Sequence, residues 1–193
     1  MKRLISCLLI ISMILSSVSI VFAEENKEIE NPIVEFLKSI NIVDNEYSSL
    51  KEITKAEFTA MALKIQYPET DFGIVDGDKI FNDVDITHRY YSYIKAAKEM
   101  NIVNGGYMGN FNPDKIITLS EAVSILINTI NYTIFAKATG SYPTGYIYTA
   151  KLAGILNNIE INYDGIVNGE IAARLIYNTL FASVVEIAYY TDD

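Results

Sequence analysis

Apolar side chains in the middle of the chain recur at helical spacing in two stretches, with a glycine-rich loop between them. In residues 88–100 the apolar positions lie three or four residues apart, which predicts an amphipathic helix. We expect Asn104-Gly105-Gly106 to end this helix, because glycine accepts the left-handed conformation of a helix terminus. Thr118 and Glu121 predict a second helix that begins with a capping box. Residues 81–131 are therefore predicted to form a helix, a loop and a capped helix.

The same unit recurs on both sides of this stretch. Three segments align as helix ends: 39–43, 99–103 and 152–156. Three more align as helix starts: 53–57, 117–121 and 166–170. The separation from the isoleucine of each end to the glutamate of each start is 15 residues (42 to 57), 19 (102 to 121) and 15 (155 to 170). This near-constant spacing indicates three repeats, which we place at 32–66, 81–131 and 141–181.

The three predicted helix starts differ in their capping residues. Thr54 and Glu57 predict a second capping box. In the third repeat Val167 stands at the threonine position, and Asn168 is the alternative cap. Each capped helix can bury its apolar face only against its neighbours, so the pattern predicts one all-α unit.

Both ends of the chain lie outside these repeats. Lys2 and Arg3 precede an apolar stretch and the small-x-Ala site at 21–23, which together predict a signal peptide over residues 1–23. An acidic leader, residues 24–31, follows it without a basic stop-transfer flank, so we expect no membrane anchor after cleavage. The tail, residues 182–193, fits a short strand, a helix extension or the start of another domain. It is also a candidate contact for a protein partner.

Charge and cysteine content narrow the function. The formal net charge is −9, and loss of Lys2 and Arg3 with the signal peptide takes it to −11. Nucleic acid is therefore not an expected partner, because phosphate backbones are bound by Lys and Arg. Cys7, the only cysteine, lies in the signal peptide, so the exported 170 residues contain no disulfide. A chain of this length buries about 70% of the surface that is exposed when it is unfolded, which is enough for a stable core without disulfide bonds.

No catalytic or metal-binding pattern stands out. His88 is the only histidine, and it has neither a nucleophile motif nor companion ligands for a metal. We expect it to pack and cap at a helix start, and we expect Asp83 to cap the helix that follows it. The sequence thus predicts no enzyme activity, no cofactor and no metal site.

The motifs of the second repeat, taken in order, resemble the S-layer homology domains of bacterial surface proteins. They are Phe81-Asn82-Asp83-Val84, His88, Ile102-Val103-Asn104-Gly105, Gly109-Asn110-Phe111-Asn112-Pro113, and Ile117-Thr118 with Glu121. The first repeat matches the family at Ile53-Thr54-Lys55-Ala56-Glu57. The third is similar to clostridial variants through Tyr142-Pro143-Thr144-Gly145-Tyr146 and Leu175-Ile176-Tyr177-Asn178. Over residues 31–181 the resemblance implies an all-α bundle of three helix–loop–helix repeats in pseudo-threefold arrangement. It also implies grooves between the repeats that hold a pyruvylated cell-wall polysaccharide.

The arginine with which the family contacts its ligand is absent here. Its position falls on Lys55 in the first repeat, Leu119 in the second and Asn168 in the third. Leucine cannot replace an arginine fork that holds a carboxylate, and lysine offers only a point charge. We therefore expect charge chemistry only in the groove beside Lys55, which we place on the exposed side of its helix start.

Other family positions have changed as well. The loop aspartate and loop arginine of the family correspond to Met108 and Asn112, and its tryptophan corresponds to Arg89. The candidate glycan-binding residues that the resemblance leaves are Lys55, Asp83, Tyr90, Tyr91, Asn104, Gly105 and Gly109.

Two functions fit this sequence. The first is a non-catalytic module, secreted to the cell surface, that anchors to the wall by non-covalent binding of polysaccharide. The second is a scaffold that keeps the fold and acts in structure or protein interaction without binding glycan. Convergence of basic and aromatic side chains in a groove between repeats would favour the first.

Overall fold

The computed structural model describes residues 31–70, 72–73 and 79–182, so the predictions for the signal peptide, most of the acidic leader and nearly all of the tail fall outside it. The elements are α2 (Pro32–Ser39), α3 (Lys55–Gln66), α4 (Tyr91–Glu99), the 3₁₀ turn η1 (Tyr107–Gly109), α5 (Leu119–Thr129), α6 (Thr133–Thr139), α7 (Thr144–Leu152) and α8 (Gly169–Leu180). The only β pairing among the described residues is three isolated bridges. The predicted all-α class is confirmed for this part of the chain.

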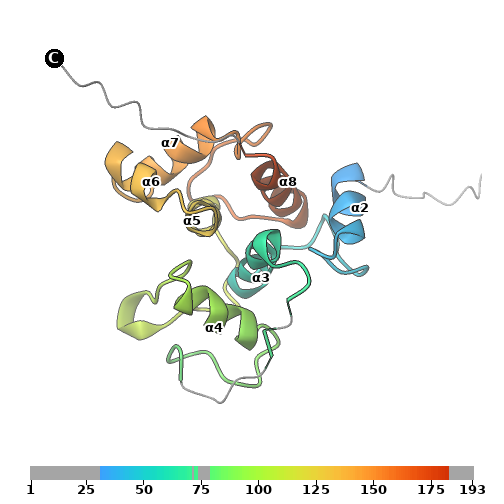
Figure 1. The fold of residues 1–193 in the computed structure, drawn as a ribbon, viewed down its shortest axis with the longest axis vertical. Coiled ribbons are helices and arrows are strands. Elements are labelled where there is room, and N and C mark those ends of the chain that lie inside the picture. Colours follow the sequence, from blue (N-terminus) through green and yellow to red (C-terminus); the bar gives the residue numbers. More distant parts are fainter. Residues whose placement is uncertain (1–30, 71, 74–78, 183–193) are drawn as a thin grey trace, which may run out of the picture. The chain divides into compact units, whose positions relative to one another are not determined.

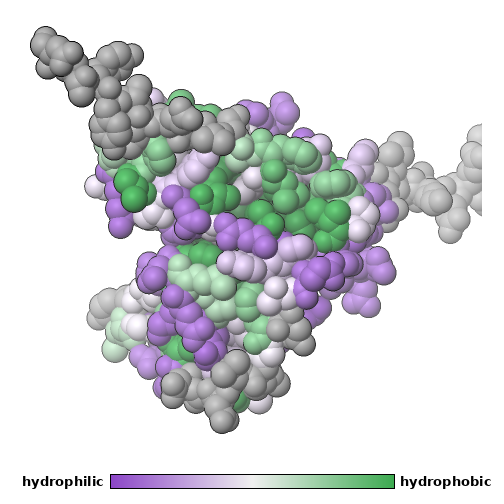
Figure 2. Space-filling model, viewed as in Figure 1, coloured by the Kyte–Doolittle hydropathy of each residue, from purple (hydrophilic) through white to green (hydrophobic). Residues whose placement is uncertain are grey.

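Three capped helices, α3, α5 and α8, contact one another pairwise and carry much of the core (Figure 1). Each also packs against one further helix: α3 against α4, α5 against α7, and α8 against α2. The buried side chains form a single cluster to which all of these helices contribute. On the face shown in Figure 2, apolar side chains gather over α8 and its neighbour α2. Phe36, Tyr177 and Phe181 form an aromatic cluster between these two helices.

The segments that precede the capped helices meet in a closed ring of backbone hydrogen bonds. Ile53 N–H donates to Val167 O, Val167 N–H to Ile117 O, and Ile117 N–H to Ile53 O, each at 3.0 Å. All three side chains are fully buried. This ring joins the three predicted repeats at one point, whereas the pseudo-threefold arrangement of whole repeats stays a prediction.

The first turn of each capped helix bonds to the loop of another repeat. In α3, Lys55 N–H donates to Lys115 O at 2.9 Å and Ala56 N–H to Pro113 O at 3.0 Å. In the equivalent bonds of α5 and α8, a helix N–H also donates to a loop carbonyl oxygen: Leu119 to Gly165, Ser120 to Tyr163, Gly169 to Lys51, and Glu170 to Ser49. The first N–H groups of a helix have no partner within the helix. Here the neighbouring repeat supplies those partners, in cyclic order.

The predicted caps are correct at Thr118 and only half correct at Thr54. The capping box of Thr118 and Glu121 is confirmed in both directions. Thr54 accepts from Glu57 N–H, but the Glu57 carboxylate binds Lys51 Nζ at 3.0 Å and no reciprocal bond to Thr54 is formed. Lys51 Nζ lies 3.0 Å from both carboxylate oxygens of Glu57, whereas Lys115 Nζ is farther from those of Glu121, at 3.3 and 3.4 Å, and Glu121 Oε2 also accepts from Thr118 N–H.

Asn168 caps α8, its Oδ1 accepting from Ile171 N–H at 2.9 Å. Val167 therefore corresponds to Ile53 and Ile117, and the predicted alignment of the third repeat was wrong by one residue. The misalignment arose from matching Glu170 with Glu57 and Glu121, although Glu170 lies one position closer to the cap. Consequently Gly169, and not Asn168, occupies the helix position of Lys55 and Leu119.

The predicted helix 88–100 is shorter than expected, and Asn104-Gly105-Gly106 does not end it. The helix is α4, and the chain turns at Asn101, which has φ of 58°. Ile102 N–H donates to Ala97 O at 2.8 Å and Asn101 N–H to Lys98 O at 3.0 Å, which is a Schellman motif. Asparagine also tolerates the left-handed conformation, so the helix ends before the glycines are reached. Asn41 and Gly154 end α2 and α7 in the same way, with φ of 58° and 79°.

One helix, α6, was not predicted. It has only seven residues, among them Thr133, Ile134 and Thr139, and it packs against α7. β-branched residues have weak helix propensity, so this helix depends on tertiary packing rather than on a local signal.

Replacement of Gly169 by alanine is expected to lower the free energy of unfolding by about 1–3 kcal/mol, the usual cost of overpacking. A Cβ at this position would lie 2.1 Å from the backbone oxygen of Ser48, so the helix start of α8 would have to move away from the first repeat. Gly106→Ala is the matched control, because its Cβ would meet only Asn110 O at 3.6 Å, an ordinary contact. Urea unfolding checks this, and equal midpoints for the two variants would contradict the assigned packing.

Candidate ligand-binding grooves

Three surface cavities lie beside the starts of the capped helices, one for each predicted repeat. The Lys55 groove has a volume of about 480 Å³ and is lined by Lys55, residues 102–106, Glu121, Ser124, Ile125, Asn128 and Tyr142. The Lys64 groove, of about 200 Å³, is lined by residues 42–44, Tyr47, Glu57, Ala60, Met61, Lys64, Arg89, Tyr90 and Tyr93. The Leu119 groove, of about 240 Å³, is lined by Leu119, Glu160, Asn162, residues 165–167 and Ile171.

Lys55 crosses from α3 into the loop of the second repeat. Its ammonium lies 4.8 Å from the centroid of the Phe111 ring and 3.9 Å from Glu121 Oε1. The side chain is 16% exposed, so the expectation of an exposed lysine was wrong. Burial lowers the pKa of Lys55, and the Glu121 carboxylate opposes this effect. The groove thus holds a cation that is largely withdrawn from water, where electrostatic interactions are stronger than at an open surface.

Phe111 forms the floor beneath this lysine. It is fully buried and stacks on Phe81 at 5.2 Å between ring centroids, so it anchors its loop in the core. Asp83 fixes the same loop by accepting from Phe111 N–H at 2.7 Å and Asn112 N–H at 2.6 Å. The prediction that Asp83 caps the following helix was therefore wrong. The carboxylate instead serves a loop 28 residues away, which local sequence patterns cannot indicate.

Glu121 links the groove to the helix cap. Its Oε2 accepts from Thr118 N–H at 3.1 Å, and its Oε1 lies 3.3 Å from Lys115 Nζ. Burial raises the pKa of Glu121, but the bond from Thr118 and the charges of Lys55 and Lys115 outweigh burial, so the pKa lies below its usual value. With two lysines around one carboxylate, this cluster carries one net positive charge.

The Lys64 groove has a different source of charge. Lys64 is half-buried on α3, 5.9 Å from the Tyr93 ring centroid. Arg89 lies over the Tyr90 ring at 5.3 Å, and its Nη2 is 3.3 Å from Asp44 Oδ2. Burial lowers the pKa of Lys64, and Asp44 counteracts it. The groove therefore brings two cations and three tyrosines to one cavity, as the sequence analysis had not foreseen.

The Leu119 groove is of another kind. Leu119 is buried, Ile171 stands at the position of Glu57 and Glu121, and no Lys or Arg is among its lining residues. Glu160 is its one charged lining residue. This cavity suits apolar or neutral groups and repels anions.

The predicted site residues separate into four places. Lys55, Asn104 and Gly105 lie together in the Lys55 groove, whereas Tyr90 lines the Lys64 groove. Tyr91 is 3% exposed and belongs to the core, where it lines another cavity with Asp83. Gly109 lies apart from the grooves, and its O accepts from Asn82 N–H at 3.1 Å.

Sequence reasoning missed Lys64, Asn128 and Tyr142. A sequence signal existed for Lys64 and Asn128, because each lies seven residues after the glutamate at the third position of its capped helix. Lys64 follows Glu57 in α3, and Asn128 follows Glu121 in α5. Asn128 Nδ2 donates to Ile102 O at 2.9 Å, which ties α5 to the groove loop. Tyr142 arrives from the third repeat, and no local pattern indicates that contact.

His88 packs beside Tyr90 as predicted, but it bonds the N–H of Tyr90, which precedes α4, and α4 begins without a side-chain cap. Its Nδ1 accepts from Tyr90 N–H at 3.1 Å, so the ring proton is on Nε2, which lies 3.3 Å from Asp114 Oδ1. Among the described residues, no three His, Cys, Asp or Glu side chains are grouped so as to hold a metal ion. No helix in the described part of the chain is long and apolar enough to span a membrane.

Glu121→Gln is expected to flatten the dependence of stability on pH in the acidic range. The pKa of Glu121 is lower in the folded state than in the unfolded state, so its contribution is complete above the unfolded value, about 4.3. This contribution is lost as the pH falls through the folded value. Urea unfolding between about pH 5 and pH 3 checks this, with Glu46→Gln, an exposed loop carboxylate, as control. Parallel pH profiles for wild type and Glu121→Gln would refute the role assigned to Glu121.

This chain is similar to several known proteins, among them proteins of the cell wall and the surface layer. Residues 80–123 match the family model of the S-layer homology domain. The chain is 24% identical over 150 residues to the Middle cell wall protein of Brevibacillus brevis, an alignment that covers 78% of this chain and 14% of that protein. It is 28% identical over 158 residues to Exoglucanase XynX of Acetivibrio thermocellus, covering 79% of this chain and 14% of the relative. With the Surface-layer 125 kDa protein of Lysinibacillus sphaericus it shares 29% identity over 127 residues, or 60% and 10% of the two chains.

The matched part is therefore a small fraction of each relative's length. The family match falls on the second repeat, where the motifs of the sequence are most complete. There Asp83 holds the Phe111 loop, Phe111 lies beneath Lys55, and Thr118 caps α5. The resemblance is confirmed by these matches: residues 80–123 match the model of the S-layer homology domain, and the chain is similar to cell-wall and surface-layer proteins.

Proposed function

We propose that this chain is a non-catalytic module, secreted to the cell surface, that binds an acidic cell-wall polysaccharide in the Lys55 groove. The observation that carries the proposal is the position of Lys55. Its ammonium projects from a helix start over the Phe111 ring, in a cavity whose opposite wall belongs to the segment that matches the S-layer homology domain.

The groove offers the chemistry that an acidic sugar needs. Its cluster of Lys55, Lys115 and Glu121 has one net positive charge, although the whole chain has a formal charge of −9. Tyr142 is 52% exposed at its edge and can pack against a sugar face. Asn104 and Gly105 line the same groove and can offer backbone and amide groups to sugar hydroxyls. A single ammonium gives weak, salt-sensitive attraction, so we expect modest affinity for one groove.

The proposal concerns a module and not a whole protein. The relatives are much longer than the part they share with this chain, and one of them is named as an exoglucanase. We assign polysaccharide binding to the grooves described here and no activity to any region outside them.

Lys55→Met is expected to lower binding to purified cell-wall sacculi by up to about fivefold at low salt, because an ion pair of up to ~1 kcal/mol is lost while the side-chain stem remains over Phe111. Lys137→Met, on the exposed last turn of α6, is the matched control. Leu119→Arg is expected to strengthen binding, because it restores a cation at the equivalent helix position. Cosedimentation with sacculi, with and without their secondary polymers, measures these effects.

Salt-insensitive binding that survives Lys55→Met would refute the role of this lysine. Failure of the wild type to sediment with polymer-bearing sacculi would favour the alternative, a scaffold that acts in structure or protein interaction without glycan. The two results are distinct, because the first retains binding and the second never shows it.

The purified protein is expected to release no sugar or peptide from peptidoglycan or wall polysaccharide. His88 is engaged at both ring nitrogens, by Tyr90 N–H and by Asp114, and neither partner is a hydroxyl or thiol that it could deprotonate. Reducing-end and amino-group assays on sacculi check this. Turnover that disappears in His88→Ala but persists in the control Lys137→Met would overturn the non-catalytic assignment.

A further inference from the structure

The tetrapeptide Ile-Val-Asn-Gly occurs twice in the chain, at residues 102–105 and at residues 166–169. In an Asn-Gly pair the backbone nitrogen of the glycine can attack the side-chain amide carbon of the asparagine, because no Cβ on the glycine obstructs the approach. Asparagine counts among the thermolabile residues of proteins. Since the two tetrapeptides are identical, the fold decides how the reactivity of Asn104 differs from that of Asn168.

The fold holds Asn168 and Gly169 at both reacting groups. Asn168 Oδ1 accepts from Ile171 N–H at 2.9 Å as the cap of α8, and Gly169 N–H donates to Lys51 O at 2.7 Å. Gly169 is also buried. Cyclisation would break both hydrogen bonds at the start of a packed helix, and a buried polar group that loses its partner is costly. Asn168 is therefore protected.

Asn104 has neither of these restraints. Asn104 and Gly105 are both exposed, in the loop between α4 and η1. Within the described part of the chain, no hydrogen bond engages the Asn104 side chain or the Gly105 N–H. The loop is held one residue later, where Gly106 N–H donates to Asn110 O at 2.8 Å. The nitrogen of Gly105 and the amide carbon of Asn104 are thus free to approach each other.

We propose that Asn104 is a site of spontaneous deamidation, and that the carboxylate formed there cancels the positive charge of the Lys55 groove. Gly105 N loses its proton and bonds to Asn104 Cγ, the bond from Cγ to Nδ2 breaks, and ammonia leaves with the proton. Water then opens the resulting succinimide at either carbonyl, which gives an aspartate or an isoaspartate linkage at this position. The reaction is a hydrolysis overall, so it needs no oxidant or reductant.

The new carboxylate would lie among the charges of the Lys55 groove, because Asn104 lines that groove together with Lys55 and Glu121. The cluster of Lys55, Lys115 and Glu121 carries one net positive charge, so one added carboxylate makes the groove neutral. The attraction between the groove and an anion falls accordingly. This effect on binding rests on the function proposed above, whereas the modification site does not.

Mass spectrometry of tryptic peptides tests the modification site, because fragmentation reports each asparagine separately. The protein is stored in a mildly alkaline buffer, in one sample folded and in another unfolded by guanidinium chloride. We expect exchange of NH₂ for OH at Asn104 alone in the folded protein. Both Asn104 and Asn168 should react in the unfolded protein, because unfolding removes the bonds that protect Asn168. Equal reaction at the two sites of the folded protein, or none at Asn104, would overturn the inference.

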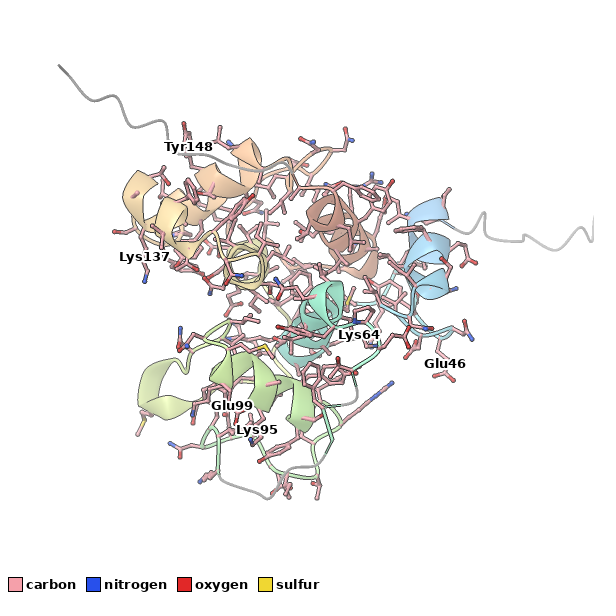
Figure 3. The ribbon with its side chains drawn as sticks, in the orientation of Figure 1. Glu46, Lys64, Lys95, Glu99, Lys137 and Tyr148 are labelled. Atoms are coloured by element: carbon pink, nitrogen blue, oxygen red, sulfur yellow. The ribbon has the colours of Figure 1, made fainter. Side chains whose placement is uncertain are left out.

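Two substitutions separate the chemistry from its effect on binding. Asn104→Gln keeps an amide but should not react, because its cyclisation requires a larger ring. Asn104→Asp carries the charge of the product from the start. Lys137→Met is the charge-matched control, because it changes the net charge of the chain by the same amount. Figure 3 shows Lys137 projecting outward from α6, and it is not among the residues that line the Lys55 groove.

Cosedimentation with polymer-bearing sacculi at low salt measures the effect on binding. We expect storage to weaken binding of the wild type by up to about fivefold and to leave Asn104→Gln unchanged. Fresh Asn104→Asp should bind like the stored wild type, and Lys137→Met like the fresh wild type. Modified protein that binds as tightly as fresh protein would overturn the charge effect. If the fresh wild type does not sediment, the proposed function and the effect on binding both fail, and the mass measurement still decides the modification site.

Discussion

The closed ring of hydrogen bonds among Ile53, Ile117 and Val167 is the constraint on which the rest of the structure depends. These residues are fully buried, and a buried backbone group without a partner costs about as much as a lost hydrogen bond. Each of the three segments can meet this requirement only if the other two are present. The ring therefore makes the three repeats one unit and brings three helix starts to neighbouring positions.

The same arrangement determines where the grooves lie and what they can bind. A helix N-terminus is ordinarily a site for anions, because its first N–H groups are unpaired. Here the loop of the next repeat accepts the first two of these groups in α3, α5 and α8, and a side-chain cap accepts the next. The helix backbone has no free donors for a ligand at these points. Charge for an acidic ligand must therefore come from side chains, which is why one changed residue, such as Leu119, alters a whole groove.

Local signals in the sequence were enough for the helices other than α6 and for most of their starts. The caps at Thr118 and Thr54 follow from neighbours in the chain, and both are present. The end of α4 was misplaced, because asparagine and glycine can both take the left-handed turn and the first of them in the chain, Asn101, did so. The partners of Asp83 and the approach of Tyr142 to α5 depend on contacts across 28 and 22 residues, so they lie beyond pattern reasoning.

The differences among the grooves follow a coupled change at two positions. In the first two repeats a loop lysine pairs with the third helical residue, Lys51 with Glu57 and Lys115 with Glu121. In the third repeat the corresponding residues, six apart as in the other pairs, are Gly165 and Ile171. Removing only one member of such a pair would leave a partly buried charge without its partner, whereas removing both leaves an apolar surface that packs without that cost.

Because Glu57 and Glu121 each line a groove, their lysine partners also set the charge of that groove. The Leu119 groove has lost this pair, and it has an apolar helix-start side chain as well. The two grooves that keep the pair are also the two that present a cation, from Lys55 in one and from Lys64 and Arg89 in the other. The charge of the Lys55 groove therefore depends on its repeat's ion pair and on its neighbour's helix start together, whereas the Lys64 groove takes its cations from Lys64 and Arg89.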